Sequence, residues 1–457
     1  MKTFLKPFAE EMVSLDQGIG SGVSWVHPVT KQFHRSTVKL LVTVFDAPAR
    51  AMGQNVMHHN GRYGCNVCET KACLTPPVPG YKRLRRFEYI HTPTLRTKDR
   101  MYGQAVRVNL EGLDHAKGTF SLGPWCIKDR ISDLDEFLKI FRHPSFVHRI
   151  LRQLGSLKYW KASDFYYFML FESLPCLKGH LPDVYFQHFT LLVIGISKLL
   201  KTNVTELDIS EADSLLRLFV MDFGRLYGPR SCTYSVHQLI HLGLCVRRFG
   251  PLHCWSAFVY EDLNGMVAKR THGTNNVDAE IVRNIKICQG IHVLNNVARE
   301  HHGMNVLRDP LQSEILGKEL CVKLPVDELL LLQDNEPTVY SRAKLGYDTF
   351  TSEMHKTLKS QNFHVMWMGN EQFQYGSIKY FARTQHGDYV VIRLLKVDHT
   401  QVFYHRETQK CAEHFIPVSD TQHQVVIKFV DIVKSIVKVG RIGRYLYKRP
   451  NLYRYVL

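Results

Sequence analysis

A pair of cysteines two residues apart is the feature that most restricts how this chain can fold. Cys65 and Cys68 stand in YGCNVCE, where Gly64 and Asn66 favour a tight turn that we call the knuckle. Such a pair binds a metal, forms a redox couple or packs in a core. A redox pair usually opens a helix after a strand, and the preceding NGRYG loop does not fit that context. A tetrahedral metal site needs two more ligands, so the chain would have to return to the knuckle.

The best candidates for the missing ligands lie far along the chain in SVHQLIHLG. His237 and His241 are four residues apart, so on a helix they share one face, one turn apart. Chance readily gives such a spacing among 24 histidines, and the rival ligands are Cys73, His58 and His59. The eleven cysteines are scattered and odd in number, which favours a reduced compartment over a disulfide framework.

The charge balance indicates a polyanionic partner. The chain of 457 residues carries a formal net charge of +17, with a pI near 9.3. Nucleic acid is the simplest partner for such an excess of base, while a basic solvated surface without a ligand is the alternative. The N-terminal residues carry acids too early for a signal peptide. The longest apolar run, residues 189–200, is too short to span a bilayer, so we expect no membrane contact.

Apolar patterning divides the chain into three regions. TVKLLVTVF, residues 37–45, reads as a strand buried on both faces and leads into Asp46. Helical stripes follow, at Phe186 to Leu200 and at Leu215 to Leu226, with Ser210 and Asp213 resembling a capping box. From about residue 340, strands are expected in YGSIKYFARTQ, DYVVIRLLKV, TQVFYHRET and HQVVIKFVDI. Four or five short strands with tight turns indicate a small barrel or a sandwich.

Six motifs in a fixed order resemble those of a known family. They are FLKPFAEEM, VFDAPARA, HHNGRYGCNVC, YWKASDFYYFMLFESLPCL, YSVHQLIHL and FGPLHCWSAFVYEDLNG, and with their surroundings they cover residues 4–286. They are similar to the transposases of the CACTA, or En/Spm-like, class and to host genes descended from them. The C-terminal GRYLYKRPNLYRYVL resembles the β domain that often follows this core in animal relatives.

The resemblance implies a fold and a set of site residues. The family has an RNase H-like core with a helical insertion, and an Asp-Asp-Glu triad that coordinates two magnesium ions. By matched motif, Asp46 would be the second acid and Glu261 the third. The family also pairs a Cys-x-x-Cys with a downstream histidine pair, which carries over to the four residues Cys65, Cys68, His237 and His241 as a structural zinc site. From the residues alone, Asp46 reads as a helix cap and Glu261 as a solvated carboxylate.

Two departures from the family pattern affect the expected activity. The family's first Asp lies on a strand upstream of FLKPF, which here begins at Phe4, and the Asp-x-x-His segment expected after the knuckle is not found. Either these pieces have been lost or the reading frame is incomplete. We therefore expect Asp46 and Glu261 to be vestigial and magnesium binding, if retained, to be weak.

The resulting expectation is an α+β protein with four parts. These are a truncated RNase H-like core with the knuckle at 1–142, a helical insertion and return to the core at 143–305, a linker at 306–339 and a C-terminal SH3-like β barrel at 340–457. The expected function is that of a domesticated or degenerate transposase-like protein that binds DNA or chromatin without catalysis. It would act in the nucleus, or in both cytoplasm and nucleus, with protein partners or self-association as further expectations.

Two other functions remain open from the sequence. One is a working metal-dependent DNA transposase or nuclease, and the other is a protein-interaction module without a nucleic-acid role. The expected phosphate contacts lie in the C-terminal tail from Lys434, which has seven basic residues and no acid, or in the basic segment from Lys82 to Arg86. The alternative for the tail is a basic edge of the β domain.

Overall fold

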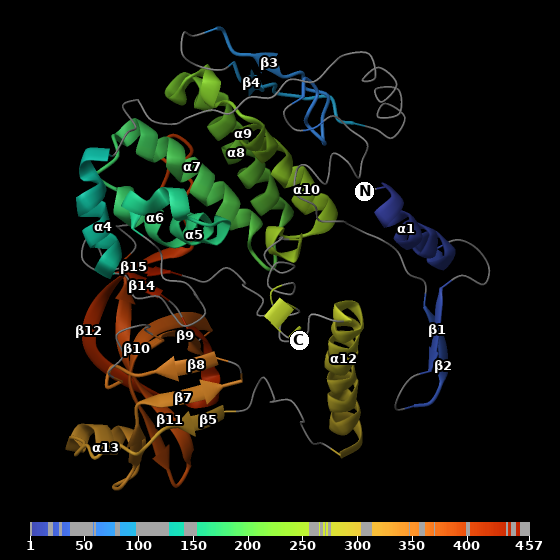
Figure 1. Ribbon diagram of the computed structural model, residues 1–457. Helices are drawn as coiled ribbons and strands as arrows, with labels where there is room; N and C mark the ends of the chain where they lie inside the picture. Colours follow the sequence, from blue (N-terminus) through green and yellow to red (C-terminus); the bar gives the residue numbers. More distant parts are fainter. Residues whose placement is uncertain are drawn as a thin grey trace. The chain divides into compact units, whose positions relative to one another are not determined.

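The computed structural model is an α+β molecule made of two units (Figure 1). Unit 1 comprises Met1–Cys126, Gln187–Met304 and Asn451–Leu457, and unit 2 comprises Ile127–Phe186 and Asn305–Pro450. The structure describes residues 2–16, 22–26, 30–36, 58, 61–77, 83–96, 128–140, 153–255, 265, 268–269, 271–272, 276–302, 313–346, 348–355, 362–369, 371–398, 403–435, 437–439 and 445–447. The expected strand at 37–45, with Asp46, His59 and Glu261, lies outside them.

Unit 1 is mainly helical in its described part. Its strands are β1 (Val23–Val26), β2 (Phe33–Ser36), β3 (Cys73–Leu74) and β4 (Arg85–Arg86). Its helices are α1 (Lys2–Asp16), α7 (Asp183–Leu199, which begins in unit 2), α8 (Glu206–Tyr227), α9 (Tyr234–Gln238), α10 (Leu242–Phe249) and α12 (Val277–His302), with short 3-10 turns η4 (Pro229–Ser231), η5 (Leu239–His241) and η6 (Leu252–Trp255). The expected helical stripes correspond to α7 and α8, whose apolar positions are largely buried.

Helix α8 begins earlier than the sequence suggested. Thr205 is its N-cap: the Thr205 hydroxyl accepts the Asp208 N–H, and the Asp208 carboxylate accepts the Thr205 N–H. This is a capping box. The predicted cap at Ser210 and Asp213 is wrong, because both residues lie inside the helix and Asp213 accepts from Arg217 at 2.7 Å. A hydroxyl residue followed three residues later by an acid occurs twice, at Thr205 with Asp208 and at Ser210 with Asp213. Only the first pair marks the start of α8.

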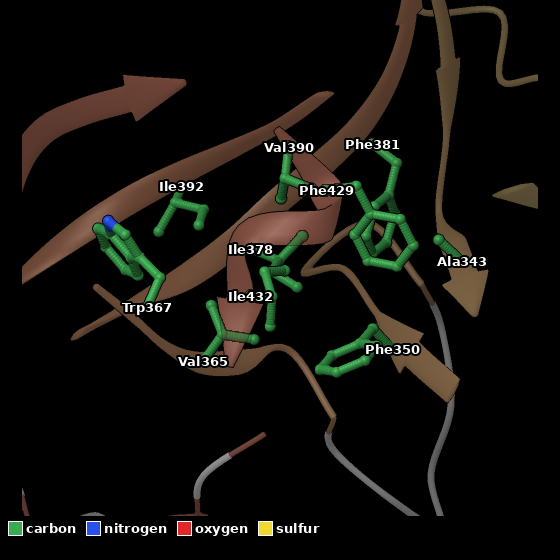
Figure 2. Packing of buried hydrophobic residues seen from close by; sticks show 10 residues of the cluster. All are labelled: Ala343, Phe350, Val365, Trp367, Ile378, Phe381, Val390, Ile392, Phe429 and Ile432. Atoms are coloured by element: carbon green, nitrogen blue, oxygen red, sulfur yellow. The ribbon is translucent and has the colours of Figure 1, made fainter. Parts of the chain in front are cut away.

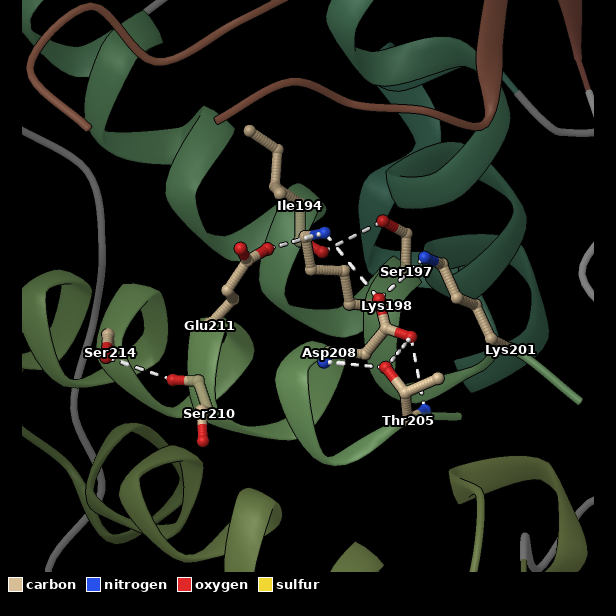
Figure 3. Close-up of polar contacts among 9 residues, drawn as sticks. All are labelled: Ile194, Ser197, Lys198, Lys201, Thr205, Asp208, Ser210, Glu211 and Ser214. Carbon is tan, nitrogen blue, oxygen red and sulfur yellow. Dashed lines mark hydrogen bonds and ion pairs between the residues drawn. The ribbon is translucent and has the colours of Figure 1, made fainter. Parts of the chain in front are cut away.

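Buried charges join α7 to α8 (Figure 3). Lys198, whose side chain is 6% exposed, reaches Glu211 at 2.9 Å and Asp208 at 3.7 Å. Lys201 donates to the same Asp208 carboxylate at 2.6 Å. A buried charge that loses its partner is strongly destabilising, so this network fixes how the end of α7 faces the start of α8.

Unit 2 combines a helical segment with β-sheets. The helical segment contains η1 (Lys128–Arg130), α4 (Ile131–Ile140), η2 (Leu154–Tyr159), α5 (Ala162–Tyr167), the π-helical turn η3 (Phe168–Glu172) and α6 (Ser173–Leu177). The strands are β5 (Ser313–Leu316), β6 (Thr338–Tyr340), β7 (Arg342–Leu345), β8 (Asp348–Thr351), β9 (His364–Gly369), β10 (Gln372–Thr384), β11 (Gly387–Val397), β12 (Phe415–Lys428), β13 (Ile432–Ser435), β14 (Val437–Val439) and β15 (Tyr445–Tyr447), with helices α13 (Val326–Leu332) and η7 (Phe429–Asp431).

The expected strands appear in this unit, with one exception. The residues 400–408, expected as a strand, contain only the isolated bridge of Tyr404 with Cys411 among their described positions. The stretch 306–339, expected as a linker, contributes β5, α13 and β6, and β5 pairs with β7 in a three-stranded antiparallel sheet.

The main sheet of unit 2 is antiparallel throughout and curved (Figure 1). Its strand order is β13-β9-β10-β11-β12-β15-β14, and β6 pairs with the C-terminal part of β10. Register shifts in β10 and β11 mark bulges, which bend a sheet. No closed barrel is found among the described strands. However, one residue separates β13 from β14, so covalent continuity keeps the two ends of this strand order close together.

The core of unit 2 lies between the curved sheet and the three-stranded sheet (Figure 2). Phe429 in η7 contacts Phe350 of β8 and Phe381 of β10 with edge-to-face rings. Trp367 of β9 and Ile392 of β11 extend the same cluster. Alternating residues of several strands therefore supply one apolar layer, as expected for packed sheets.

The helical segment attaches to the loop between β11 and β12. Arg406 donates to Asp183 at 2.6 Å, and the Lys178 ammonium lies 5.2 Å from the centre of the Phe403 ring. Asp135 of α4 accepts the backbone N–H groups of Leu154 and Gly155. These contacts explain why residues 127–186 belong with the β-strands, whereas the sequence assigned them to the core and the helical insertion.

Candidate metal centre

The knuckle turns so that backbone donors point at one sulfur. The N–H groups of Val67 and Cys68 each donate to the Cys65 Sγ at 3.4 Å. Such donors stabilise a thiolate, which is the metal-binding form of cysteine. The side chain of Asn66, at the centre of the turn, accepts a hydrogen bond from the Tyr234 hydroxyl at 2.9 Å. This bond joins the knuckle to α9, which carries His237.

The two histidines come from consecutive turns of different helix types. His237 lies in α9, and His241 ends the 3-10 turn η5 that follows it. Their Nε2 atoms are 3.4 Å apart. The His237 Nε2 lies 3.2 Å from the Cys68 Sγ, and the His241 Nε2 lies 3.5 Å from the Cys65 Sγ. The chain thus returns to the knuckle after 169 residues.

Three distances among the four side chains agree with those of a tetrahedral site. All four residues are buried, and their ligand atoms lie within 4.8 Å of one another. With zinc–sulfur bonds of about 2.3 Å and zinc–nitrogen bonds of about 2.0 Å, a tetrahedron places two nitrogens about 3.3 Å apart and a nitrogen and a sulfur about 3.5 Å apart. The observed distances of 3.4, 3.5 and 3.2 Å are close to those values. The cluster could therefore hold a metal such as zinc.

Neighbouring side chains orient the ligands. The Gln238 amide donates to the Cys65 Sγ at 3.1 Å, and the Cys68 thiol donates to the Thr70 hydroxyl at 3.1 Å. The Phe87 ring stacks on His237, with centroids 4.8 Å apart and an interplanar angle of 21°. Such supporting contacts fix the orientation of the metal ligands and tune their affinity for metal.

Arg96 binds backbone carbonyl groups in and beside the knuckle. Its guanidinium donates to the carbonyls of Cys65 and Tyr63, both at 2.7 Å, and its own N–H donates to the Val67 carbonyl. The knuckle then contacts a small apolar cluster that includes Ala72 and Phe87. These backbone hydrogen bonds do not involve the ligand atoms, whereas the packing does, because Cys65 and Cys68 belong to that cluster.

The two thiols differ in acidity because they share one hydrogen bond. The pKa of Cys65 is lowered, chiefly by the hydrogen bond with Cys68, with further lowering by His237 and His241 against the opposing effect of burial. The pKa of Cys68 is raised by the same hydrogen bond and by its own burial. A divalent cation among these atoms would favour the thiolate form of both residues.

The rival ligands do not join this cluster in the described part of the chain. Cys73 is half-buried in β3, where it pairs with Arg86 across the ribbon, and the His58 carbonyl accepts the Gly61 N–H. His59 and the two candidate acids, Asp46 and Glu261, lie outside the described residues. The sequence indicated all four ligands but missed the supporting residues. Of these supporting residues, only Gln238 could have been found from the sequence, because it directly follows His237 in the motif.

No family model matches the chain, and no curated protein matches it. Within the residues that the structure describes, this is the single grouping of histidine, cysteine and acidic side chains with metal-ligand geometry. A separate search of those residues for a membrane-crossing helix finds none with the required length and apolar character.

Proposed function

We propose that this protein binds DNA through a basic segment fixed by a structural zinc ion. The observation that carries the proposal is the charge of the segment around the metal centre. Residues 61–96 contain seven lysines and arginines and two acids, namely Arg62, Lys71, Lys82, Arg83, Arg85, Arg86 and Arg96 against Glu69 and Glu88. Phosphate contacts from such a segment release counterions and favour nucleic acid regardless of sequence.

The arginines of the β3–β4 ribbon have capacity for further hydrogen bonds. Arg83 uses its Nε on the Thr75 carbonyl, and one Arg86 amino group pairs with Glu88 at 2.8 Å. The Nε atoms of Arg85 and Arg86 are shielded from solvent and have no hydrogen-bond partner among the described residues. A guanidinium group recognises phosphate through paired donors, and the terminal amino groups of these half-buried arginines would make those contacts.

Zinc is the metal that the donor set favours. Two thiolates and two imidazoles in a tetrahedron suit zinc, whereas calcium and magnesium prefer oxygen ligands. All four ligand positions are filled by protein side chains, which is typical of a structural rather than a catalytic site. The ion would hold the knuckle against α9 and η5.

We further infer a transposase-derived architecture from the six motifs. The Cys-x-x-Cys and histidine pair that the resemblance linked lie together here, which supports that origin. For unit 2, the curved antiparallel sheet whose end strands are one residue apart supports an SH3-like barrel. The RNase H-like core rests on the resemblance alone, because its strand and both matched acids lie outside the described residues. A DNA ligand would place the protein in the nucleus.

Salt-dependent DNA binding tests the proposal. We expect the zinc-loaded chain to bind duplex DNA of any sequence, with an affinity that falls steeply as salt rises. Replacing Arg83, Arg85 and Arg86 by Gln should flatten the plot of log affinity against log salt by about 0.9 for each phosphate that is no longer neutralised. The matched control is Arg225→Gln, at an exposed position of α8 where the arginine already pairs with Asp222. An unchanged slope in the triple variant, or no binding at low salt, would refute the proposal.

Strand cleavage is not part of the proposed function. The resemblance matches only two acids of the triad, Asp46 and Glu261, to this chain, and two-metal phosphoryl transfer needs a further bridging carboxylate. We expect no nicking of supercoiled plasmid in the presence of magnesium or manganese. Nicking by the wild type that both Asp46→Ala and Glu261→Ala abolish would instead identify an active nuclease.

A further inference from the structure

The β1–β2 ribbon of unit 1 is a small hairpin held by its own side chains. Four residue pairs align its strands, from Val23 with Ser36 to Val26 with Phe33. The Trp25 ring stacks on His34 with centroids 4.8 Å apart, and its indole N–H donates to the Ser36 hydroxyl at 2.9 Å. Since paired residues of a ribbon share a face, Trp25 and His34 lie on one face and Phe33 lies on the other.

The face that carries Phe33 is exposed and apolar. The Phe33 side chain is 70% exposed, and Val26 opposite it is 54% exposed. Arg35, two residues beyond Phe33 and on the same face, is also exposed. A two-stranded ribbon is marginally stable by itself in water, and contiguous exposed apolar side chains mark an interaction surface. The Phe33 face is therefore a candidate interaction surface.

The charged residues near the ribbon favour a negatively charged ligand. No acid occurs from Gln17 through Phe45, while this stretch contains Lys31, Arg35 and Lys39. Lys31 is exposed in the turn, where it adopts a positive φ of 56°. Exposed lysine and arginine side chains attract a polyanion and disfavour another basic partner.

We propose that the Phe33 face of the β1–β2 ribbon binds single-stranded DNA. The inference rests on the DNA-binding function proposed above and assigns it a second contact. A phenyl ring carries no hydrogen-bonding group for base edges, so it recognises bases by stacking on their faces. Those faces are accessible in unpaired DNA and covered in a duplex. Phe33 supplies the stacking surface, while Arg35 and Lys31 contact the phosphates on either side.

The test compares labelled oligothymidine with labelled duplex DNA on the zinc-loaded full chain. Phe33→Leu keeps an apolar side chain but removes the ring, and it should weaken oligothymidine binding by about tenfold. Phe33→Tyr keeps the ring and should bind as the wild type does. Duplex affinity should stay within a factor of about two in both variants, because the arginines of the β3–β4 ribbon supply that contact.

The outcomes separate this inference from the proposed function. Absence of binding to both DNA forms in the wild type would refute the proposed function. Salt-dependent duplex binding with equal oligothymidine affinity for wild type and Phe33→Leu would refute only the ribbon contact. Tighter binding of oligouridine than of oligothymidine would overturn the assignment to DNA. If Phe33→Leu perturbs the hairpin, Lys31→Gln with Arg35→Gln must still flatten the salt dependence of oligothymidine binding.

Discussion

At the scale of single residues, the metal centre depends on four side chains that sequence order keeps far apart. Each ligand pairs with one from the other segment, Cys68 with His237 and Cys65 with His241. A structural zinc ion bound here would contribute on the order of 10 kcal/mol to folding, and the four ligands would then act together rather than as separate contacts. Removal of any one should therefore affect both the knuckle and the helix that carries the histidines.

We expect the purified protein to hold one zinc ion per chain, and Cys65→Ser or Cys68→Ser to lose it. A serine hydroxyl does not replace a thiolate as a zinc ligand at neutral pH. The double variant His237→Ala with His241→Ala should behave in the same way. Metal analysis of the dialysed proteins gives the stoichiometry, with Cys73→Ser as the control because Cys73 lies outside the cluster. Full zinc content in the histidine double variant would show that other residues hold the metal.

The hydrogen bond from Gln238 to Cys65 should tune the affinity for zinc without deciding whether the site forms. Gln238→Met keeps the length of the side chain and removes the donor, so zinc affinity should fall by about 10- to 100-fold. Competition with a chromophoric chelator measures that change. Tyr234→Phe, which removes the hydroxyl that contacts Asn66 rather than a sulfur, is the comparison and should have the smaller effect.

At the scale of elements, local patterns predicted which segments form helices and strands better than where they begin. The apolar stripes of α7 and α8 indicated both helices, since a stripe at helical spacing must be buried. The apolar stripe does not show at which residue the helix begins, and two pairs of a hydroxyl residue and an acid have the sequence pattern of a capping box for α8. Thr205 and Asp208 form the box because they stand at the first helical turn, whereas Ser210 is already inside the helix.

Thr205→Ala should lower the free energy of unfolding of unit 1 by about 1 kcal/mol, because the Asp208 N–H loses its acceptor. Chemical denaturation followed by circular dichroism measures the difference. Ser210→Ala is the matched control: the position is exposed and inside the helix, where alanine is favourable. Equal destabilisation by both changes would contradict the observed helix start.

Other parts of the fold could not be predicted from local patterns. An apolar stripe shows that a face is buried and does not show which partner covers it, so residues 127–186 gave no sign that they join the β-strands. The sequence TQVFYHRET has the residue types of a strand, yet Phe403 and Arg406 contact the helical segment instead. The supporting residues Phe87 and Thr70 are invisible in the sequence for the same reason: their role depends on contacts across the chain.

At the scale of the whole molecule, the polypeptide crosses between the two units four times. Unit 2 takes the segment 127–186 from between the knuckle and the histidines, then continues after residue 304. Unit 1 contains the metal-ligand cluster as well as the buried apolar faces of α7 and α8, whereas unit 2 has its own apolar core between its sheets. Conditions that protonate buried groups should therefore affect the units differently.

Unit 2 should lose stability as the pH falls, through His414. Burial lowers the pKa of this imidazole to about 3, whereas a histidine in an unfolded chain titrates near pH 6.5. Between those values the unfolded chain binds a proton that the folded chain does not, so the free energy of unfolding falls by up to about 1.4 kcal/mol per pH unit. Above about pH 6.5 this effect is absent. His414→Gln should flatten the dependence, measured by denaturation of unit 2 at several pH values, and an unchanged slope would exclude His414 as its source.

The distance along the chain between the two halves of the metal site has a consequence for biosynthesis. The ribosome completes the knuckle 169 residues before it reaches His237. At about 5 to 20 residues per second, this leaves Cys65 and Cys68 without their histidine partners for roughly 10 to 30 seconds. During that interval the nascent thiols can bind a metal only incompletely and are open to oxidation to a disulfide. Assembly of a metal-bound centre would therefore require that both thiols stay reduced while the chain is still being made.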